Sequence, residues 1–170
     1  MSASTISVRL AALSDIPACA AVHIESCLDI YRSFVSQEVH ATSLPANLKA
    51  IWAAEQLESG DFIVLAEDDG KVVGIVTVRN RETGYIDHFH VLPSFKRKGI
   101  GRLLMRAAVA EMRKQGMKSC YLDFAVGNDG AKLFYTALGG ELGEEVEGDL
   151  FGHPLPAQVV RWPDLANVSI

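Results

Sequence analysis

The chain has few cysteines, and their spacing argues against a disulfide-stabilised fold. Its 170 residues include only Cys19, Cys27 and Cys120, with no C-x-x-C pair. An odd number without paired spacing predicts no disulfide framework. We therefore expect reduced thiols, buried as small apolar side chains in a cytoplasmic protein.

The chain also lacks a long apolar run. One of its most apolar stretches, residues 62–66, is far shorter than the roughly 20 residues that cross a bilayer. Residues 1–7 have neither the basic region nor the apolar region of an export signal. These absences predict no membrane partner. The length predicts a single domain, residues 1–170, with a sizeable core.

Positive charge is in deficit as well. The 16 Lys and Arg residues face 21 Asp and Glu residues, which gives a net charge of −5. Nucleic-acid binding needs a basic face, so the balance predicts no nucleic-acid partner. The acidic excess lies elsewhere than the basic residues, many of which gather in one short loop.

That basic loop follows a strand-like run, residues 85–92, and opens a helical run, residues 100–114. It consists of Lys96, Arg97, Lys98, Gly99, Ile100, Gly101 and Arg102. The first turn of a helix has backbone N–H groups without helical partners and a partial positive charge. Glycines allow close backbone approach and positive φ. The loop therefore predicts a binding site for a polyphosphate anion.

Two common phosphate loops are excluded by what this segment lacks. It has no G-x-x-x-x-G-K-[ST] string, and the third glycine of G-x-G-x-x-G is missing after Gly101. The segment resembles instead the acyl-CoA pyrophosphate loop of the GNAT acyltransferase superfamily, [Q/R]-x-x-G-x-[G/A]. Its first position is Lys96 rather than Gln or Arg, which keeps a cation but loses a planar donor.

A second segment, residues 128–140, supports the same resemblance. It is similar to the family pattern N-x-x-A-x-x-[FL]-Y-x-x-x-G-[FG], through Asn128, Ala131, Phe134, Tyr135 and Gly139. Asn128 suits a helix N-cap, and Gly139 suits a C-cap. The resemblance implies that Asn128, Ala131, Phe134 and Tyr135 contact the cofactor, acetyl-CoA.

The order of the remaining elements fits a mixed α/β fold. Alternation predicts strands at residues 6–10, 62–67, 71–79, 117–124, 141–147 and 158–162. Helices are predicted from Ser14 to about Leu28, from Leu44 to near Gly60, and within residues 128–139. With the loop helix, the order βααβββαβαββ is that of the GNAT fold.

The alternation of apolar and polar residues is interrupted within the strand predicted at residues 85–92. Ile86, Phe89 and Val91 share one apolar face only if one extra residue lies between Ile86 and Phe89. An extra residue of this kind is a β-bulge. The resemblance implies that the bulge splays this central strand from the next. Main-chain groups of Phe89, His90 and Val91 then pair with the pantetheine arm and bind the thioester oxygen.

The expected chemistry is direct attack of an amine on an acyl thioester. The resemblance places Tyr135 at the CoA sulfur, where it protonates the leaving thiolate. Asp87 is the first choice for the base and also faces the acceptor; His88 and His90 are the alternatives. A metal site at Asp87, His88 and His90 lacks an evident further ligand, so we expect no metal.

The acceptor pocket is expected between the first two helices, with Tyr31, Phe34 and Trp52 as aromatic walls. His23, Glu25 and Cys27 could also reach it from the first helix. The expected acceptor is a primary amine on a small or amino-acid-like molecule. The alternatives are a protein or peptide amine, and a non-catalytic acyl-CoA sensor. The resemblance further implies a homodimer through the C-terminal strands.

Overall fold

The computed structural model describes residues 5–55 and 57–170 and contains one large mixed sheet. Its strand order is β1-β2-β3-β4-β5-β9-β6. The strands are β1 Ile6–Leu10, β2 Phe62–Asp68, β3 Lys71–Arg79, β4 Gly84–Val91, β5 Cys120–Ala125, β6 Glu141–Val146 and β9 Ala157–Trp162. The expected α/β class and GNAT-type order are confirmed, with one added hairpin, β7 Asp149–Leu150 and β8 His153–Pro154.

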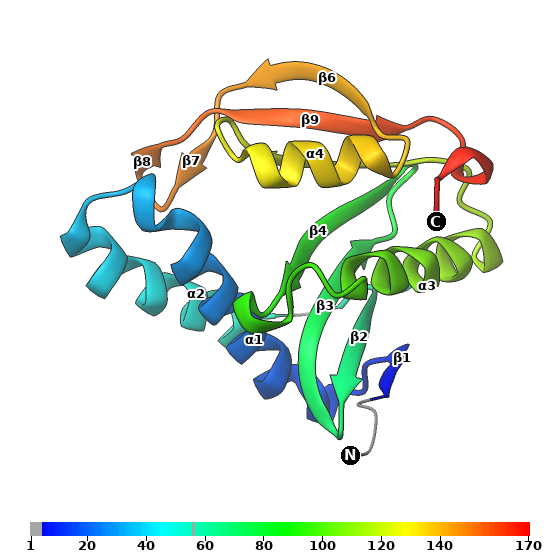
Figure 1. Cartoon of the computed structure of the whole chain (residues 1–170), viewed down its shortest axis with the longest axis horizontal. Helices are drawn as coiled ribbons and strands as arrows, with labels where there is room; N and C mark the ends of the chain where they lie inside the picture. Colours follow the sequence, from blue (N-terminus) through cyan, green and yellow to red (C-terminus); the bar gives the residue numbers. More distant parts are fainter. Residues whose placement is uncertain (1–4, 56) are drawn as a thin grey trace.

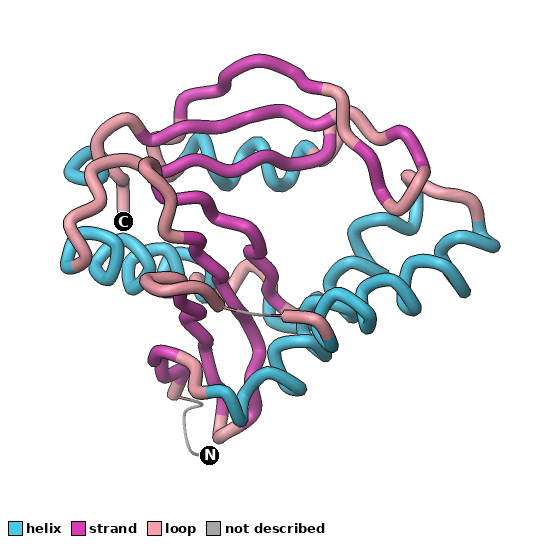
Figure 2. Tube along the Cα trace, turned by 180° about the vertical axis from the view of Figure 1, so that it is seen from behind, coloured by secondary structure: helices cyan, strands magenta, loops and turns pink. Residues whose placement is uncertain are grey.

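Four α-helices flank the sheet: α1 Ile16–Ile30, α2 Leu44–Ala53, α3 Ile100–Lys114 and α4 Asp129–Ala137. Alternation along β4 sends His88 and His90 toward α1, where they meet His23. Phe89 points to the other face and contacts Phe134 of α4. Helices α1 and α4 therefore cover opposite faces of the sheet, as the opposed views of Figures 1 and 2 allow the reader to follow.

The second helix ends earlier than its apolar pattern predicts. The pattern reaches Leu57 and Gly60, yet α2 ends at Ala53. The Glu55 carboxylate lies 2.7 Å from the Arg79 guanidinium, and its side chain is only 4% exposed. Glu55 therefore makes a contact with β3 just after the end of the helix, which the local apolar pattern does not reveal.

Only one strand pair of the sheet is parallel, and it is short. Strands β4 and β5 pair at Gly84 with Cys120 and at Tyr85 with Tyr121. The pairs β1–β2, β2–β3, β3–β4, β5–β9 and β6–β9 are antiparallel. Beyond Tyr85 the two strands separate, and the sheet divides into a β1–β4 part and a β5–β9–β6 part (Figure 1).

The core lies on both sides of β2 and β3, whose central residues are buried. Leu65, Ile75 and Val76 are fully covered, as are Leu104 and Met105 of α3. No helix in the described part of the chain is long and apolar enough to cross a membrane. This core fixes β4 against β3 and leaves its other edge free beyond Tyr85.

Candidate active site

The register between β3 and β4 contains the predicted bulge. Val78 pairs with Ile86, and the adjacent Thr77 pairs with His88. Asp87 is therefore the extra residue, placed between Ile86 and Phe89 as expected. A bulge bends the strand and turns a side chain toward a new direction. Here it coincides with the separation of β4 from β5.

A cavity of about 860 Å³ opens where the two strands separate. Most of the predicted site residues line it: Tyr31, Asp87, His88, Phe89, His90, Val91, Lys96, Arg97, Gly99, Ile100, Gly101, Arg102, Asn128, Ala131, Phe134 and Tyr135. The residues named from the sequence that do not line it are Glu25, Phe34, Trp52 and Lys98. Lys98 lies over the Phe95 ring, and Phe34 stacks edge-on against Tyr31. The tertiary structure thus joins segments far apart in the sequence into one site.

The basic loop has the backbone that its glycines predict. Gly99 is the N-cap residue of α3 and has φ of +79°, and Arg97 also has positive φ. The free N–H groups of the first turn of α3 lie at the cavity beside the Arg97 side chain. Lys96 is partly neutralised, because its Nζ lies 2.8 Å from the Asp29 carboxylate of α1. This arrangement fits the pyrophosphate of a CoA-type ligand.

Helix α4 starts and ends as its sequence predicts. The Asn128 side chain accepts a hydrogen bond from the Ala131 N–H at 3.1 Å. Gly139, with φ of +81°, follows the helix, and its N–H bonds the Thr136 carbonyl. Tyr135 is held among the rings of Phe89, Phe124, Phe134 and Trp162. Burial raises the pKa of the Tyr135 hydroxyl, so it stays protonated.

Asp87 is paired with Arg79, a partly buried arginine of β3. The Arg79 Nε donates to the Asp87 carboxylate at 2.9 Å. The same guanidinium also pairs with Glu55 at 2.7 Å and with Asp61 at 3.4 Å. Arg81 also reaches Asp61, at 3.7 Å, so the three carboxylates share two arginines, which leaves this end of the cavity negative.

A second carboxylate, Asp123, faces the cavity from β5 and was not among the residues singled out from the sequence. The Tyr85 hydroxyl donates to Asp123 Oδ2 at 3.4 Å. Burial, and then the charge of Asp87, raises the pKa of Asp123. Its signal in the sequence was a single acidic residue within an apolar strand. Its place in the site is evident only from the folded structure, in which β4 and β5 lie side by side.

The rings of three histidines, His23, His88 and His90, pack against one another next to the bulge. The rings of His23 and His90 lie 4.3 Å apart, and those of His23 and His88 lie 4.5 Å apart. Burial, with a contribution from His88, lowers the pKa of His23 to about 3. Burial also lowers the pKa values of His88 and His90. All three rings are therefore uncharged at neutral pH.

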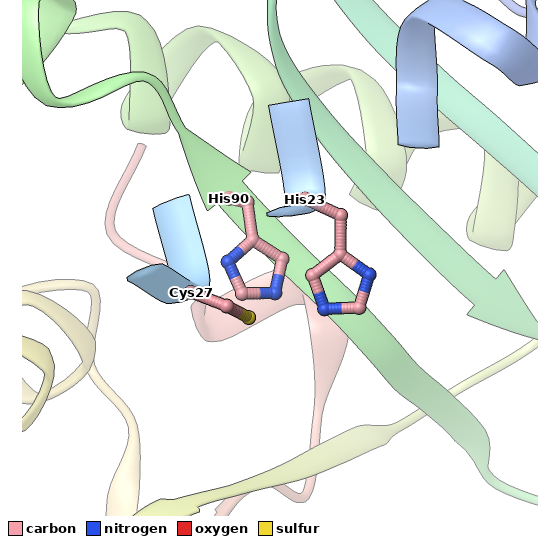
Figure 3. A group of neighbouring side chains, drawn as sticks. All are labelled: His23, Cys27 and His90. Carbon is pink, nitrogen blue, oxygen red and sulfur yellow. The ribbon is translucent and has the colours of Figure 1, made fainter. Parts of the chain in front are cut away.

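The possible metal site considered from the sequence would have a different set of ligands in the structure. His90 does meet other ligand-type side chains, but they are His23 and Cys27 of α1 rather than Asp87 and His88. One ligand atom from each of these three lies within 4.8 Å of the others. The side chains converge at the cavity wall (Figure 3).

Comparison with known proteins agrees with this geometry. The profile of the Acetyltransferase (GNAT) family matches residues 24–139. The uncharacterised N-acetyltransferase MJ1207 of Methanocaldococcus jannaschii is 34% identical over 57% of this chain, which spans 46% of that relative. The uncharacterised N-acetyltransferase YuaI of Bacillus subtilis is 24% identical over 96% of both chains.

The fold is also shared with solved structures. That of yncA from Salmonella typhimurium, determined with its cofactor acetyl-CoA, superposes with a TM-score of 0.68. The two sequences are 20% identical over 95% of each chain, and similarity at this level shows a shared fold. Because the family profile covers more than half of the chain, this protein belongs to the GNAT acetyltransferase family.

Proposed function

We propose that this protein transfers an acetyl group from acetyl-CoA to the primary amine of a small molecule. One observation carries the proposal: the bulge at Asp87, the basic loop and Tyr135 all open into a single cavity. The loop end of that cavity is positive, and the Asp87–Asp123 end is negative. Such a division matches an anionic acyl donor at one end and a cationic amine at the other.

The residues suited to hold acetyl-CoA are those of the loop and the free edge of β4. The first turn of α3 and Arg97 would bind the pyrophosphate. No residue of β4 beyond Tyr85 pairs with β5. Because the Leu92 N–H bonds Val73 of β3, alternation turns the main-chain groups of His90 toward β3 and leaves those of Phe89 and Val91 available to the pantetheine arm. Bound acetyl-CoA supplies an activated thioester for attack. The N–H groups of this edge are placed to stabilise the developing oxyanion.

The acidic end would bind and deprotonate the acceptor. An alkylammonium has a pKa near 10.4, so it must lose a proton before it attacks. Asp123, with its raised pKa, is the better proton acceptor. Asp87, held by Arg79, serves as a fixed negative charge that attracts the ammonium. His88 remains an uncharged alternative acceptor beside Asp87, at 3.9 Å.

A small acceptor is favoured over a protein by the hairpin β7–β8, which extends toward α1 and α2 (Figure 1). Leu150 and Phe151 of this hairpin pack against Cys27, Leu44 and Leu48. The contact joins the C-terminal part of the sheet to the helices around the acceptor end. It restricts access there, whereas a protein amine needs an open groove.

The first experiment measures acetyl-CoA binding by calorimetry, followed by thiol release with amines, amino acids and lysine peptides. We expect binding, and turnover with small amines. Tyr135→Phe should keep acetyl-CoA affinity and lose on the order of 10²-fold in kcat, because the thiolate loses its proton donor. Tyr121→Phe is the matched control, since Tyr121 does not line the cavity. Binding without any turnover would favour an acyl-CoA sensor, and absent binding would refute the proposal.

We also propose a cytoplasmic setting and a homodimer through the C-terminal strands. The three cysteines are free and buried, which suits a reducing compartment. Strand β6 is the outermost strand of the sheet and exposes Leu142 and Val146. Glu144 is paired with Arg161, but Glu141 and Glu145 of the same strand are exposed and would repel a second copy at low ionic strength. Sedimentation at low and high salt tests this: dimerisation should strengthen with salt, and a monomer at both would exclude it.

A further inference from the structure

Three metal-ligating side chains that the proposed reaction does not use meet at the wall of the cavity. His23 and Cys27 come from α1, and His90 comes from β4. Figure 3 shows the two imidazole rings and the thiol pointing toward one another. One ligand atom from each lies within 4.8 Å of the others, so all three can reach a common ion once the stacked rings of His23 and His90 rotate out of their present arrangement.

The local structure explains this convergence. His23 and Cys27 are four residues apart on a helix, so they lie one turn apart on the same face. Both are buried, at 5% and 2% exposure. The alternation of β4 beyond the bulge turns the His90 side chain toward that face, where it stacks on His23 at 4.3 Å. Two elements distant in sequence thus supply ligands to one point.

The contact of His90 with Ser26 resembles the support that metal-ligating histidines usually have. Ser26 Oγ lies 3.1 Å from His90 Nδ1. If Nδ1 carries the proton and donates it to Ser26, the Nε2 lone pair is free to coordinate. Cys27 is a thiol, so a bound ion must displace its proton to solvent.

We propose that His23, Cys27 and His90 form an inhibitory site for Zn²⁺. Two imidazoles and one thiolate favour zinc or cobalt over Mg²⁺ and Ca²⁺, which prefer oxygen ligands. All three residues line the same cavity as Asp87, so an ion held by them would add positive charge to the cavity that, on the proposed function, the cationic acceptor must enter. Zinc binding and acceptor binding would therefore be antagonistic.

Trp52 makes this site weak and reversible. Its Nε1–H donates to His23 Nδ1 at 2.8 Å, which places the His23 proton on Nε2. Coordination through Nε2 requires the proton to move to Nδ1, and the Trp52 hydrogen bond is then lost. The net worth of such a bond corresponds to roughly tenfold in affinity. This cost suits a site that responds to changing zinc levels rather than one that retains a resident ion.

The test uses Co²⁺ alone as a spectroscopic probe, followed by competition with Zn²⁺. Wild-type protein should bind one equivalent of Co²⁺ with a thiolate-to-cobalt charge-transfer absorption, which Zn²⁺ abolishes. Cys27→Ala should lose this absorption, and His90→Gln should weaken binding at least tenfold. Cys120→Ala is the matched control, since Cys120 is also buried but lies on β5 outside the group. Thermal unfolding of each variant confirms that it folds.

Trp52→Phe gives a second, opposite readout. Removing the indole N–H frees His23 Nδ1, so Co²⁺ affinity should rise about tenfold. An unchanged affinity would remove His23 from the ligand set and overturn the three-residue site. The proposal is equally overturned if wild-type protein shows no thiolate absorption, or if the absorption survives in Cys27→Ala. These binding measurements do not depend on acetyl transfer, so failure of the proposed function leaves them valid.

Discussion

The ring of Phe134 lies directly over the backbone of Gly101. A Cβ atom placed on Gly101 would stand 2.8 Å from Phe134 Cζ, well inside van der Waals contact. Gly101 opens α3, and Phe134 belongs to α4. The two segments that the sequence singled out separately, the basic loop and the Asn128 helix, are therefore packed against each other at the cofactor end of the cavity.

This contact predicts a specific coupling between the two residues. Gly101→Ala should destabilise the protein by about 1–3 kcal/mol, because the added methyl overlaps the ring. With Phe134→Ala already present, the same change should cost little, because the overlapping ring is gone. Urea unfolding of the four members of this double-mutant cycle measures the coupling. Additive costs would show that the contact is not the reason for glycine here.

At Gly99 there is space for a side chain, because nothing lies within 4 Å of an added Cβ. What disfavours any other residue there is the backbone, whose φ is +79°. Gly99→Ala should cost about 1 kcal/mol of stability, and Gly70→Ala, with φ of +78° in the β2–β3 turn, should cost about the same. Only Gly99→Ala should weaken acetyl-CoA binding, which calorimetry measures. Equal affinities for both variants would argue against the loop as the pyrophosphate site.

Asp123 should set the acidic limb of the pH–rate profile. Its raised pKa means that it becomes the carboxylate, and so a base, only at a higher pH than an ordinary aspartate. The value of kcat/KM should therefore rise with pH through that raised pKa and level off above it. Asp123→Asn should abolish this limb. Asp87→Asn should keep the limb but move it to lower pH, because it removes a charge that raises the pKa of Asp123, and it should raise the KM of the amine. A limb that vanishes only in Asp87→Asn would return the base to Asp87.

The buried histidines predict loss of stability in mild acid. The pKa of His23 is lowered from 6.5 to about 3. Between pH 3 and pH 6.5, therefore, His23 is protonated in the unfolded chain but not in the folded chain. Stability should be complete above pH 6.5 and fall as the pH drops toward 3, by about 1.4 kcal/mol per pH unit for His23 alone. Denaturant unfolding between pH 4 and pH 8 checks this. His23→Asn should flatten the profile, whereas an unchanged slope would contradict it.

The sequence by itself determined the elements whose signals are local. Asn128 and Gly139 bound α4, Gly99 starts α3, and the broken alternation of residues 85–92 located the bulge. Caps, positive φ and side-chain alternation act over a few residues, so they can be recognised without the fold. The family motifs depend on the same short segments.

Only the tertiary structure decided the relationships between distant segments. It paired Glu55, just after the end of α2, with Arg79, and it tied Asp87 to the same arginine. It also brought Asp123 opposite the bulge and gathered His23, Cys27 and His90. Such contacts join side chains across elements that pack together because of the whole core. No local pattern encodes them, since each partner alone looks like an ordinary residue of its strand or helix.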